Sequence, residues 1–242
     1  MDEPGSLVRI GPLAHVVRAS EPPLPIVQIL GIGRNYAEHA DEQGVERPDR
    51  PLVFTKNPCS VITDGEPIRI PEACADREQV DYEGELAVVI GVPCRDISES
   101  ESLSAGGPVL GYCVANDVSA RWWQKQGSGG QFYRGKSFDT FCPLGPRVAP
   151  LAAVPDPQSL TITTTLSGER VQHDTTAKMI FPVRTLIAEL TRGVTLPAGT
   201  VILTGTPAGV GMARSPQRFL RDGDSVTVSI DGLGAITNPV RA

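Results

Sequence analysis

Two glutamates separated by one residue, Glu83 and Glu85, stand at the start of an apolar run. In a β-strand, residues two apart point to the same face, so both carboxylates would lie side by side, followed on that face by Ala87 and Val89. Two carboxylates about 4 Å apart repel each other by roughly 4 kcal/mol at an effective dielectric near 20. A hard divalent cation removes this penalty and prefers oxygen ligands. The pair is therefore a candidate metal site, although by spacing alone a strand end with two solvated glutamates is the commoner arrangement.

A third carboxylate, Asp117, follows a β-prone run and precedes a segment of helical composition at residues 120–126. By itself, an aspartate in this position is typical of a helix N-cap. Arg121 is a candidate ion-pair partner for Asp117, or a residue that supports a ligand site from behind. The sequence order alone leaves open whether Asp117 joins the two glutamates.

A histidine and a glutamate, His39 and Glu42, lie three residues apart in a segment of helix-forming composition, residues 35–43, which ends at Gly44. This spacing puts both side chains on one helix face. An imidazole with an ordinary pKa of about 6.5 exchanges protons near neutral pH, and a neighbouring carboxylate fixes its tautomer. The two residues are therefore a candidate acid–base pair, with two solvated residues on an amphipathic helix as the alternative.

Three further residues could contact an anionic ligand. Lys136, between a glycine and a serine, could stabilise developing negative charge, although it could also be a surface lysine at a strand start. Thr206 lies in a turn after an apolar strand, where its hydroxyl and the backbone N–H groups could hold a carboxylate. Gln124 could hydrogen-bond the same ligand, or it could be an exposed helical residue.

The composition describes a globular chain rather than a disordered one. Hydrophobic residues make up 40% and charged residues 21% of the 242 residues, which suffice for one large domain or one domain with a short extension. The 25 glycines and 22 prolines favour a turn-rich β architecture over a helical bundle. A formal net charge of −6 argues against a nucleic-acid partner, because phosphate binding requires a basic face.

The cysteines and the apolar segments indicate in which cellular compartment the protein is located. The five cysteines are scattered without a CxxC pair, so neither a disulfide framework nor a zinc site is predicted, and a reducing compartment is the simpler interpretation. The first residues lack the basic start and apolar run of a signal peptide, and the longest apolar stretch, residues 86–92, is too short to span a membrane. We therefore expect a cytoplasmic protein without a membrane partner.

The elements that must position these residues are short strands separated by turn residues. The β-prone runs lie at residues 7–10, 26–32, 52–55, 60–63, 86–92, 110–115, 160–166, 201–203 and 225–230. A further helical pattern at residues 184–191 has apolar residues at Leu186, Ile187 and Leu190. Since no repeat or linker divides the chain, we predict one mainly β domain at residues 26–242, after a weakly patterned lead-in at residues 1–25.

Seven segments carry a family resemblance, and they occur in the family's order. They are Gly33-Arg34-Asn35-Tyr36-Ala37-Glu38-His39, Val53-Phe54-Thr55-Lys56, Asp81-Tyr82-Glu83-Gly84-Glu85-Leu86, Asn116-Asp117-Val118-Ser119-Ala120-Arg121, Gly135-Lys136-Ser137-Phe138-Asp139-Thr140-Phe141, Pro143-Leu144-Gly145-Pro146 and Thr204-Gly205-Thr206-Pro207-Ala208-Gly209-Val210-Gly211. Over nearly its whole length the chain thus resembles the fumarylacetoacetate hydrolase family. The stretch around Cys142 resembles the branch of domain-2-type members and 2-hydroxyhepta-2,4-diene-1,7-dioate isomerases.

The resemblance implies a fold, an assembly and a set of site residues. The fold would be mainly β (mixed α/β), a β-roll or β-clip-like single catalytic domain with a few short helices, assembled as a homodimer. Mg²⁺ or Mn²⁺ would be bound by Glu83, Glu85 and Asp117. The resemblance assigns catalytic roles to His39, Glu42 and Lys136, and substrate binding to Arg34, Gln124, Gly205 and Thr206. Relatives commonly have a charged residue where this chain has Trp122, which would either pack under the metal strand or line the pocket.

The implied chemistry is metal-dependent and acts on a small 2-oxo acid through a chelated enolate, which the cation stabilises as a Lewis acid. Hydrolysis of a C–C bond in an acylpyruvate or fumarylacetoacetate-type substrate is the first hypothesis. Decarboxylation of oxaloacetate, keto–enol tautomerisation and 2-hydroxyhepta-2,4-diene-1,7-dioate isomerisation are the alternatives, because they share the enolate. A non-catalytic metal-binding protein is disfavoured by the presence of the full residue set.

Overall fold

A computed structural model describes residues 4–19, 21–42, 44 and 46–242 of the chain. Residues 1–3, at the start where no signal peptide was predicted, and Gln43, at the end of the first predicted helix, lie outside the described residues. Within the described residues, no helix is both long and apolar enough to cross a membrane.

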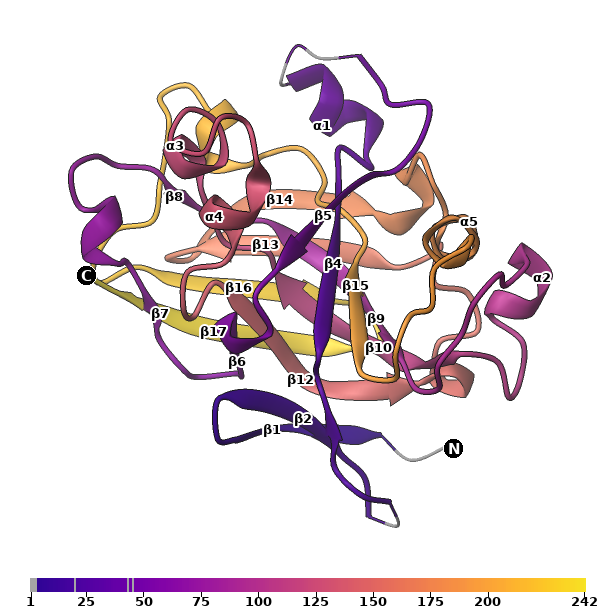
Figure 1. Cartoon of the computed structure of the whole chain (residues 1–242). Helices are drawn as coiled ribbons and strands as arrows, with labels where there is room; N and C mark the ends of the chain where they lie inside the picture. Colours follow the sequence, from indigo (N-terminus) through magenta and orange to yellow (C-terminus); the bar gives the residue numbers. More distant parts are fainter. Residues whose placement is uncertain (1–3, 20, 43, 45) are drawn as a thin grey trace.

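The described strands form three sheets, which make up most of the molecule (Figure 1). The 10-stranded sheet runs in the order β3 (Leu24–Pro25), β2 (Leu13–Val17), β1 (Gly5–Ile10), β12 (Cys142–Pro150), β10 (Val109–Asn116), β9 (Gly84–Ile90), β15 (Thr200–Leu203), β4 (Gln28–Gly33) and β5 (Leu52–Lys56), with β6 (Val61–Ile62) beside β12. The 5-stranded sheet runs β14 (Glu169–Thr175), β13 (Thr161–Leu166), β16 (Ser225–Ile230), β17 (Gly234–Arg241) and β7 (Ile68–Arg69). A 2-stranded sheet pairs β11 (Ser119–Ala120) with β8 (Val80–Asp81).

The helices are short and lie around the sheets. They are α1 (Ala37–Glu42), α2 (Glu99–Ser102), α3 (Arg121–Gln124), α4 (Phe132–Lys136) and α5 (Val183–Thr191). In the upper part of Figure 1, α1 and α3 stand at the same end of the molecule, and α4 contacts both α3 and the edge strand β5. The expectation of a mainly β fold with a few short helices is confirmed.

The core is built around β9 and β10, whose residues are all buried. Continuous burial explains why both strands read as unbroken apolar runs instead of alternating patterns. By contrast, β13 and β16 alternate between buried and half-buried residues, as a sheet with one core-facing side requires. Helix α5 buries Leu186, Ile187 and Leu190, as its pattern predicted, and each buried side chain of this kind stabilises the fold by about 1.5–3 kcal/mol.

Several strands lie where the sequence pattern gave little indication of them. The lead-in, for which one strand was predicted, forms β1, β2 and β3, and β1 pairs antiparallel with β12. Strand β12 contains three prolines, which lack the N–H that a β-ladder uses, so propensity argues against it. Proline is tolerated there because the strand pairs irregularly with β10. Strands β14 and β17 carry many charged or polar residues and were also missed.

Candidate active site

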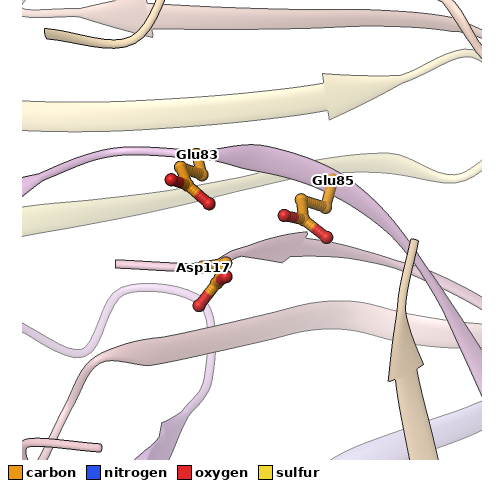
Figure 2. A group of neighbouring side chains, drawn as sticks. All are labelled: Glu83, Glu85 and Asp117. Atoms are coloured by element: carbon orange, nitrogen blue, oxygen red, sulfur yellow. The ribbon is translucent and has the colours of Figure 1, made fainter. Parts of the chain in front are cut away.

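The register between β9 and β10 brings the three carboxylates together. Ala115 pairs with Glu85 across the two antiparallel strands, and two residues further on the Asp117 N–H donates to the Glu83 carbonyl at 2.8 Å. Glu83, immediately before β9, and Glu85, within it, both point toward Asp117 (Figure 2). Each side chain offers a carboxylate oxygen within 4.8 Å of the others, and all three residues are buried. We call Glu83, Glu85 and Asp117 the carboxylate triad.

Two buried lysines neutralise part of the triad. The Lys136 Nζ lies 2.7 Å from Glu83 Oε2 and 2.5 Å from Asp117 Oδ2, and the Lys56 Nζ lies 2.6 Å from Asp117 Oδ1. Burial disfavours the ionised form of Glu83, but Lys136 and then Arg121 outweigh it and hold the pKa of Glu83 well below its usual value. Burial likewise opposes the charge of Lys136, yet Asp117 and Glu83 raise the pKa of this lysine. These groups therefore stay charged although they are buried.

The pKa of Glu85 shifts in the opposite direction to that of Glu83, and this shift tests whether a cation fits the triad. Burial, followed by the negative charges of Asp117 and Glu83, raises the pKa of Glu85 well above its usual value. Its described hydrogen bond comes from the Gly205 N–H, at 2.7 Å. Three converging oxygen donors, one of them under-neutralised, suit a hard divalent cation such as Mg²⁺ or Mn²⁺. The residues present therefore fit the ion that the triad spacing predicted.

Arg121 supports the triad from the side. Its Nη1 lies 2.6 Å from Glu83 Oε1, and its Nε donates to Asp81 Oδ2 at 2.9 Å. Asp117 is paired with lysines, and the residue that caps α3 is Ala120. Both sequence hypotheses for Asp117 taken alone, an N-cap and an ion pair with Arg121, are therefore wrong. Arg121 instead orders Glu83, which is the supporting alternative.

A cavity of about 380 Å³ opens beside the triad. Its lining includes six residues that the sequence singled out: Arg34, His39, Glu83, Gln124, Lys136 and Thr206. Glu42, Glu85, Asp117 and Gly205 lie behind this lining and reach it through hydrogen bonds or ion pairs to lining residues or to one another. Gln124 accepts a hydrogen bond from Arg121 Nη1 at 3.1 Å. The structure thus gathers all ten predicted site residues in one region.

His39 and Glu42 form a close pair at the end of α1. The His39 Nδ1 and Glu42 Oε1 are 2.6 Å apart, and His39 is only 4% exposed. The second carboxylate oxygen, Glu42 Oε2, accepts from the Gly209 N–H at 2.9 Å. Gly209 has φ 104°, and a Cβ there would meet the Val171 carbonyl oxygen at 2.2 Å, so only glycine fits. The helix and this loop together fix the orientation of the imidazole.

The turn predicted to hold a substrate carboxylate is engaged by the protein. The Gly205 N–H binds Glu85, and the Thr206 hydroxyl donates to the Gly84 carbonyl at 2.9 Å while it accepts from Gln172 Nε2 at 2.8 Å. Thr206 still lines the cavity. The turn therefore locks the triad strand in place, and its contact with substrate remains a prediction.

Two residues of this site were not singled out from the sequence. Lys56 is 2% exposed and binds Asp117, and Asp81 is fully buried and accepts from Arg121 and from the N–H groups of Gly211 and Met212. A signal existed for Lys56, because it is the last residue of the family segment Val53-Phe54-Thr55-Lys56. Asp81 carried a similar signal, because it begins one of the seven family segments and lies two residues before Glu83.

Comparison with known proteins gives the family. The model of the fumarylacetoacetate (FAA) hydrolase C-terminal domain matches residues 28–241. The chain is 46% identical over 213 residues to the mitochondrial oxaloacetate tautomerase fahd2 of Xenopus laevis, covering 88% of this chain and 65% of that protein's length. It is 40% identical over 241 residues to the oxaloacetate tautomerase YisK of Bacillus subtilis, covering 99% of this chain and 77% of that protein.

Solved structures agree with this result. The fumarylacetoacetate hydrolase of Exiguobacterium antarcticum superposes with a TM-score of 0.81 at 40% identity, covering 94% of this chain and 81% of that one. The 2-hydroxyhepta-2,4-diene-1,7-dioate isomerase of Mycobacterium marinum gives a TM-score of 0.77 at 34% identity, covering 98% and 92%. The chain belongs to the fumarylacetoacetate hydrolase family and is an enzyme of that family, as the seven segments predicted.

Proposed function

We propose that this chain is a divalent-metal-dependent tautomerase that interconverts the enol and keto forms of a small 2-oxo acid. The observation that carries the proposal is the position of His39, which is paired with Glu42 on the wall of the same cavity that Glu83 and Lys136 line. Tautomerisation needs a proton carrier and a site that stabilises an enolate, and this cavity offers both. Two relatives that bear the name oxaloacetate tautomerase support placing this reaction ahead of hydrolysis.

The carboxylate triad would hold Mg²⁺ or Mn²⁺. When bound, such an ion supplies Lewis-acid stabilisation of negative charge on the 2-oxo oxygen. Lys136 lies at the same wall and adds positive charge where an enolate oxygen would develop. Arg121 would hold the Glu83 carboxylate in place, and Lys56 would hold that of Asp117, through their ion pairs.

His39 would move the proton between the enol oxygen and the adjacent carbon. Because Glu42 occupies Nδ1, proton exchange with the substrate would use Nε2. The carboxylate of Glu42 fixes the tautomer and stabilises the imidazolium that forms when the ring takes a proton. Burial of the ring limits competition from bulk water.

Hydrolysis of an acylpyruvate is the second candidate, and the same histidine–glutamate pair favours it. A histidine oriented by a carboxylate can also activate a water molecule against a carbonyl. Hydrolysis requires that water to reach the substrate carbon inside the cavity, whereas tautomerisation does not. Whether a water molecule attacks the substrate carbon therefore decides which of the two reactions this site performs.

The test supplies the chain with Mg²⁺ or Mn²⁺ and follows two substrates by ultraviolet absorbance. We expect ketonisation of enol-oxaloacetate to accelerate with metal and to return to the spontaneous rate in a chelator. Faster consumption of acetylpyruvate than of enol-oxaloacetate would establish hydrolysis instead, and turnover of neither substrate would overturn the proposed function. Homodimeric assembly and a cytoplasmic location stay predictions from the sequence.

A further inference from the structure

The 5-stranded sheet packs directly against the backbone that carries the triad. Gly84 lies between Glu83 and Glu85 in the chain. A Cβ on Gly84 would meet Thr164 Oγ1 of β13 at 2.2 Å and Val228 Cγ1 of β16 at 3.0 Å. Because glycine has no side chain, the two backbones can approach this closely. The chain between the two glutamates is therefore in contact with the second sheet.

One side chain of that sheet, Gln172 on β14, bonds to two separate parts of the site. Its Oε1 accepts from the Gly84 N–H at 3.0 Å, and its Nε2 donates to Thr206 Oγ1 at 2.8 Å and to the Pro207 carbonyl at 2.9 Å. Since Gly84 offers a donor and Pro207 an acceptor, one orientation of the amide satisfies both. Gln172 is 2% exposed, so bulk water does not compete for these bonds.

The loop that Gln172 holds contacts both functional groups of the site. We call residues 204–209 the clamp loop. Its Gly205 N–H donates to Glu85 Oε2 at 2.7 Å, and its Gly209 N–H donates to Glu42 Oε2 at 2.9 Å. Glu42 in turn is paired with His39. A displacement of the clamp loop would therefore move a triad carboxylate and the candidate proton carrier relative to each other.

We propose that Gln172 is a positioning residue that fixes the triad and the His39–Glu42 pair relative to each other, although it does not itself line the cavity. The inference rests on the proposed function, because it assigns the metal to the triad and the proton transfer to His39. Groups that hold metal ligands from behind commonly contribute about 10- to 100-fold in metal affinity or activity. Misplacement of a reacting group by about 1 Å costs a similar factor.

The test replaces Gln172 by methionine, which has a similar length and cannot make the three hydrogen bonds. Titration calorimetry with Mn²⁺ measures metal affinity, and kinetics with enol-oxaloacetate at saturating Mn²⁺ separate kcat from KM. We expect Gln172→Met to weaken Mn²⁺ binding by about tenfold and to lower kcat by about 10- to 100-fold. KM should be almost unchanged, because the lost contacts do not hold the substrate. The electron paramagnetic resonance spectrum of bound Mn²⁺, which reports the symmetry of its ligands, should change.

Asn238 gives a matched control in the same sheet. It is 1% exposed, its Nδ2 donates to the carbonyls of Thr63 at 2.9 Å and Glu66 at 2.8 Å, and it does not line the cavity. Asn238→Leu should lower Tm about as much as Gln172→Met does, because each removes a buried amide with backbone partners. It should leave Mn²⁺ affinity, the Mn²⁺ spectrum and kcat at wild-type values.

A second substitution covers the case in which Gln172→Met does not fold. Gln172→Glu keeps the size and the acceptor for the Gly84 N–H, but it has no donor for the clamp loop. It should lower kcat by about tenfold without weakening Mn²⁺ binding. Wild-type kcat and wild-type Mn²⁺ affinity in the folded Gln172 variants, or equal losses in Asn238→Leu, would overturn the positioning role.

Failure of the proposed function gives a different result. A wild-type chain that binds Mn²⁺ but does not ketonise enol-oxaloacetate would lose the tautomerase. Weaker Mn²⁺ binding and a changed Mn²⁺ spectrum in Gln172→Met, but not in Asn238→Leu, would still establish that Gln172 positions the triad.

Discussion

The inner wall of the cavity and its rim carry charges in opposite states. We call the carboxylate triad with Lys56, Arg121 and Lys136 the inner wall. Each of its cations contacts a carboxylate and is nearly or completely buried, so these charges are compensated before any ligand arrives. We call Arg34 and Lys125, which also line the cavity, the rim: Arg34 is half-buried, Lys125 is exposed, and neither has an ion pair within the described part of the chain. Paired charges fix geometry, whereas unpaired ones attract a ligand. The difference separates the residues that build the site from those that recognise what enters it.

The largest effect is expected from breaking the inner wall. Glu83→Gln leaves Arg121 and Lys136 facing each other without their shared anion, and breaking a buried pair of this kind costs about 3–5 kcal/mol. We expect a strongly lowered Tm, loss of the Tm increase that Mg²⁺ gives to wild type, and loss of activity. Differential scanning calorimetry with and without metal measures the two Tm effects, and the ketonisation assay measures the loss of activity.

The control makes the same substitution in an exposed ion pair. Glu78 pairs with Arg221 at 2.7 Å, and both side chains are more than half exposed. Glu78→Gln should change stability by less than about 1 kcal/mol and keep the response to metal. If both variants melt alike and both respond to metal, the inner wall has no special role and the triad is misassigned.

The next effect separates chemistry from metal binding within the inner wall. His39→Ala should lower kcat by about 100- to 10,000-fold, the usual contribution of a positioned acid–base residue. Metal affinity should be almost unchanged, because His39 is paired with Glu42 and is not part of the triad. Titration calorimetry with Mn²⁺ checks the second point. Parallel loss of metal binding would make His39 a ligand and contradict the division of roles.

The inner wall should also release a proton when it binds metal. The pKa of Glu85 is raised by burial and by its acidic neighbours, so its protonated form is favoured in the metal-free protein, whereas the pKa of Glu83 is held low. Ionised Glu85 therefore costs stability as pH rises above its unfolded pKa of about 4.3, and a cation removes that cost. We expect metal affinity to fall up to about tenfold per pH unit below the raised pKa of Glu85.

Calorimetry in two buffers of different ionisation enthalpy measures this proton directly. Wild type should release up to about one proton per ion, and Glu85→Gln should release none. An enthalpy of metal binding that is the same in both buffers at every pH would show that Glu85 is already ionised in the metal-free protein. Burial and the neighbouring carboxylates would then not raise its pKa enough to affect metal binding.

The sequence predicts the central strands well and the peripheral ones poorly. Strands β9 and β10 were found because strands buried on both faces are continuous apolar runs. Strand β12 was missed because proline and glycine at Pro143, Gly145 and Pro146 are typical of turns, and only tertiary pairing overrides that preference. Local propensity cannot report a partner that lies far away in the chain.

The site shows the same limit. Two triad residues are predicted by their spacing within one strand, but Asp117 joins them only through the register with the neighbouring strand. The family resemblance supplied that link. Neither spacing nor resemblance indicated that Lys125 lacks an ion-pair partner among the described residues, because pairing depends on every side chain that surrounds it. Compensation of charge is a property of the folded structure.

The smallest effect is expected at Trp122, for which the sequence left open a place in the pocket. The structure packs this ring edge-on against Trp123, with centroids 4.8 Å apart, and under Arg77 at 4.7 Å, outside the lining of the cavity. Loss of a ring–ring contact costs about 0.5–1.5 kcal/mol. Trp122→Leu should therefore lower Tm by about 1–6 °C.

Substrate preference should hardly respond to Trp122→Leu, although the ring lies near the loop that carries Lys125. A Cβ on Gly127 of that loop would lie 2.4 Å from the Trp122 ring, so the indole supports the loop by contact. The position of Lys125 is fixed instead by backbone hydrogen bonds to Arg121 and Gly130, which the substitution leaves in place. We expect the KM for enol-oxaloacetate in Trp122→Leu to stay within about twofold of the wild-type value. A larger change in Trp122→Leu would mean that packing of the indole under the loop, and not the backbone hydrogen bonds, fixes the position of Lys125. Residues of α3 would then contribute to ligand recognition as well as to structure.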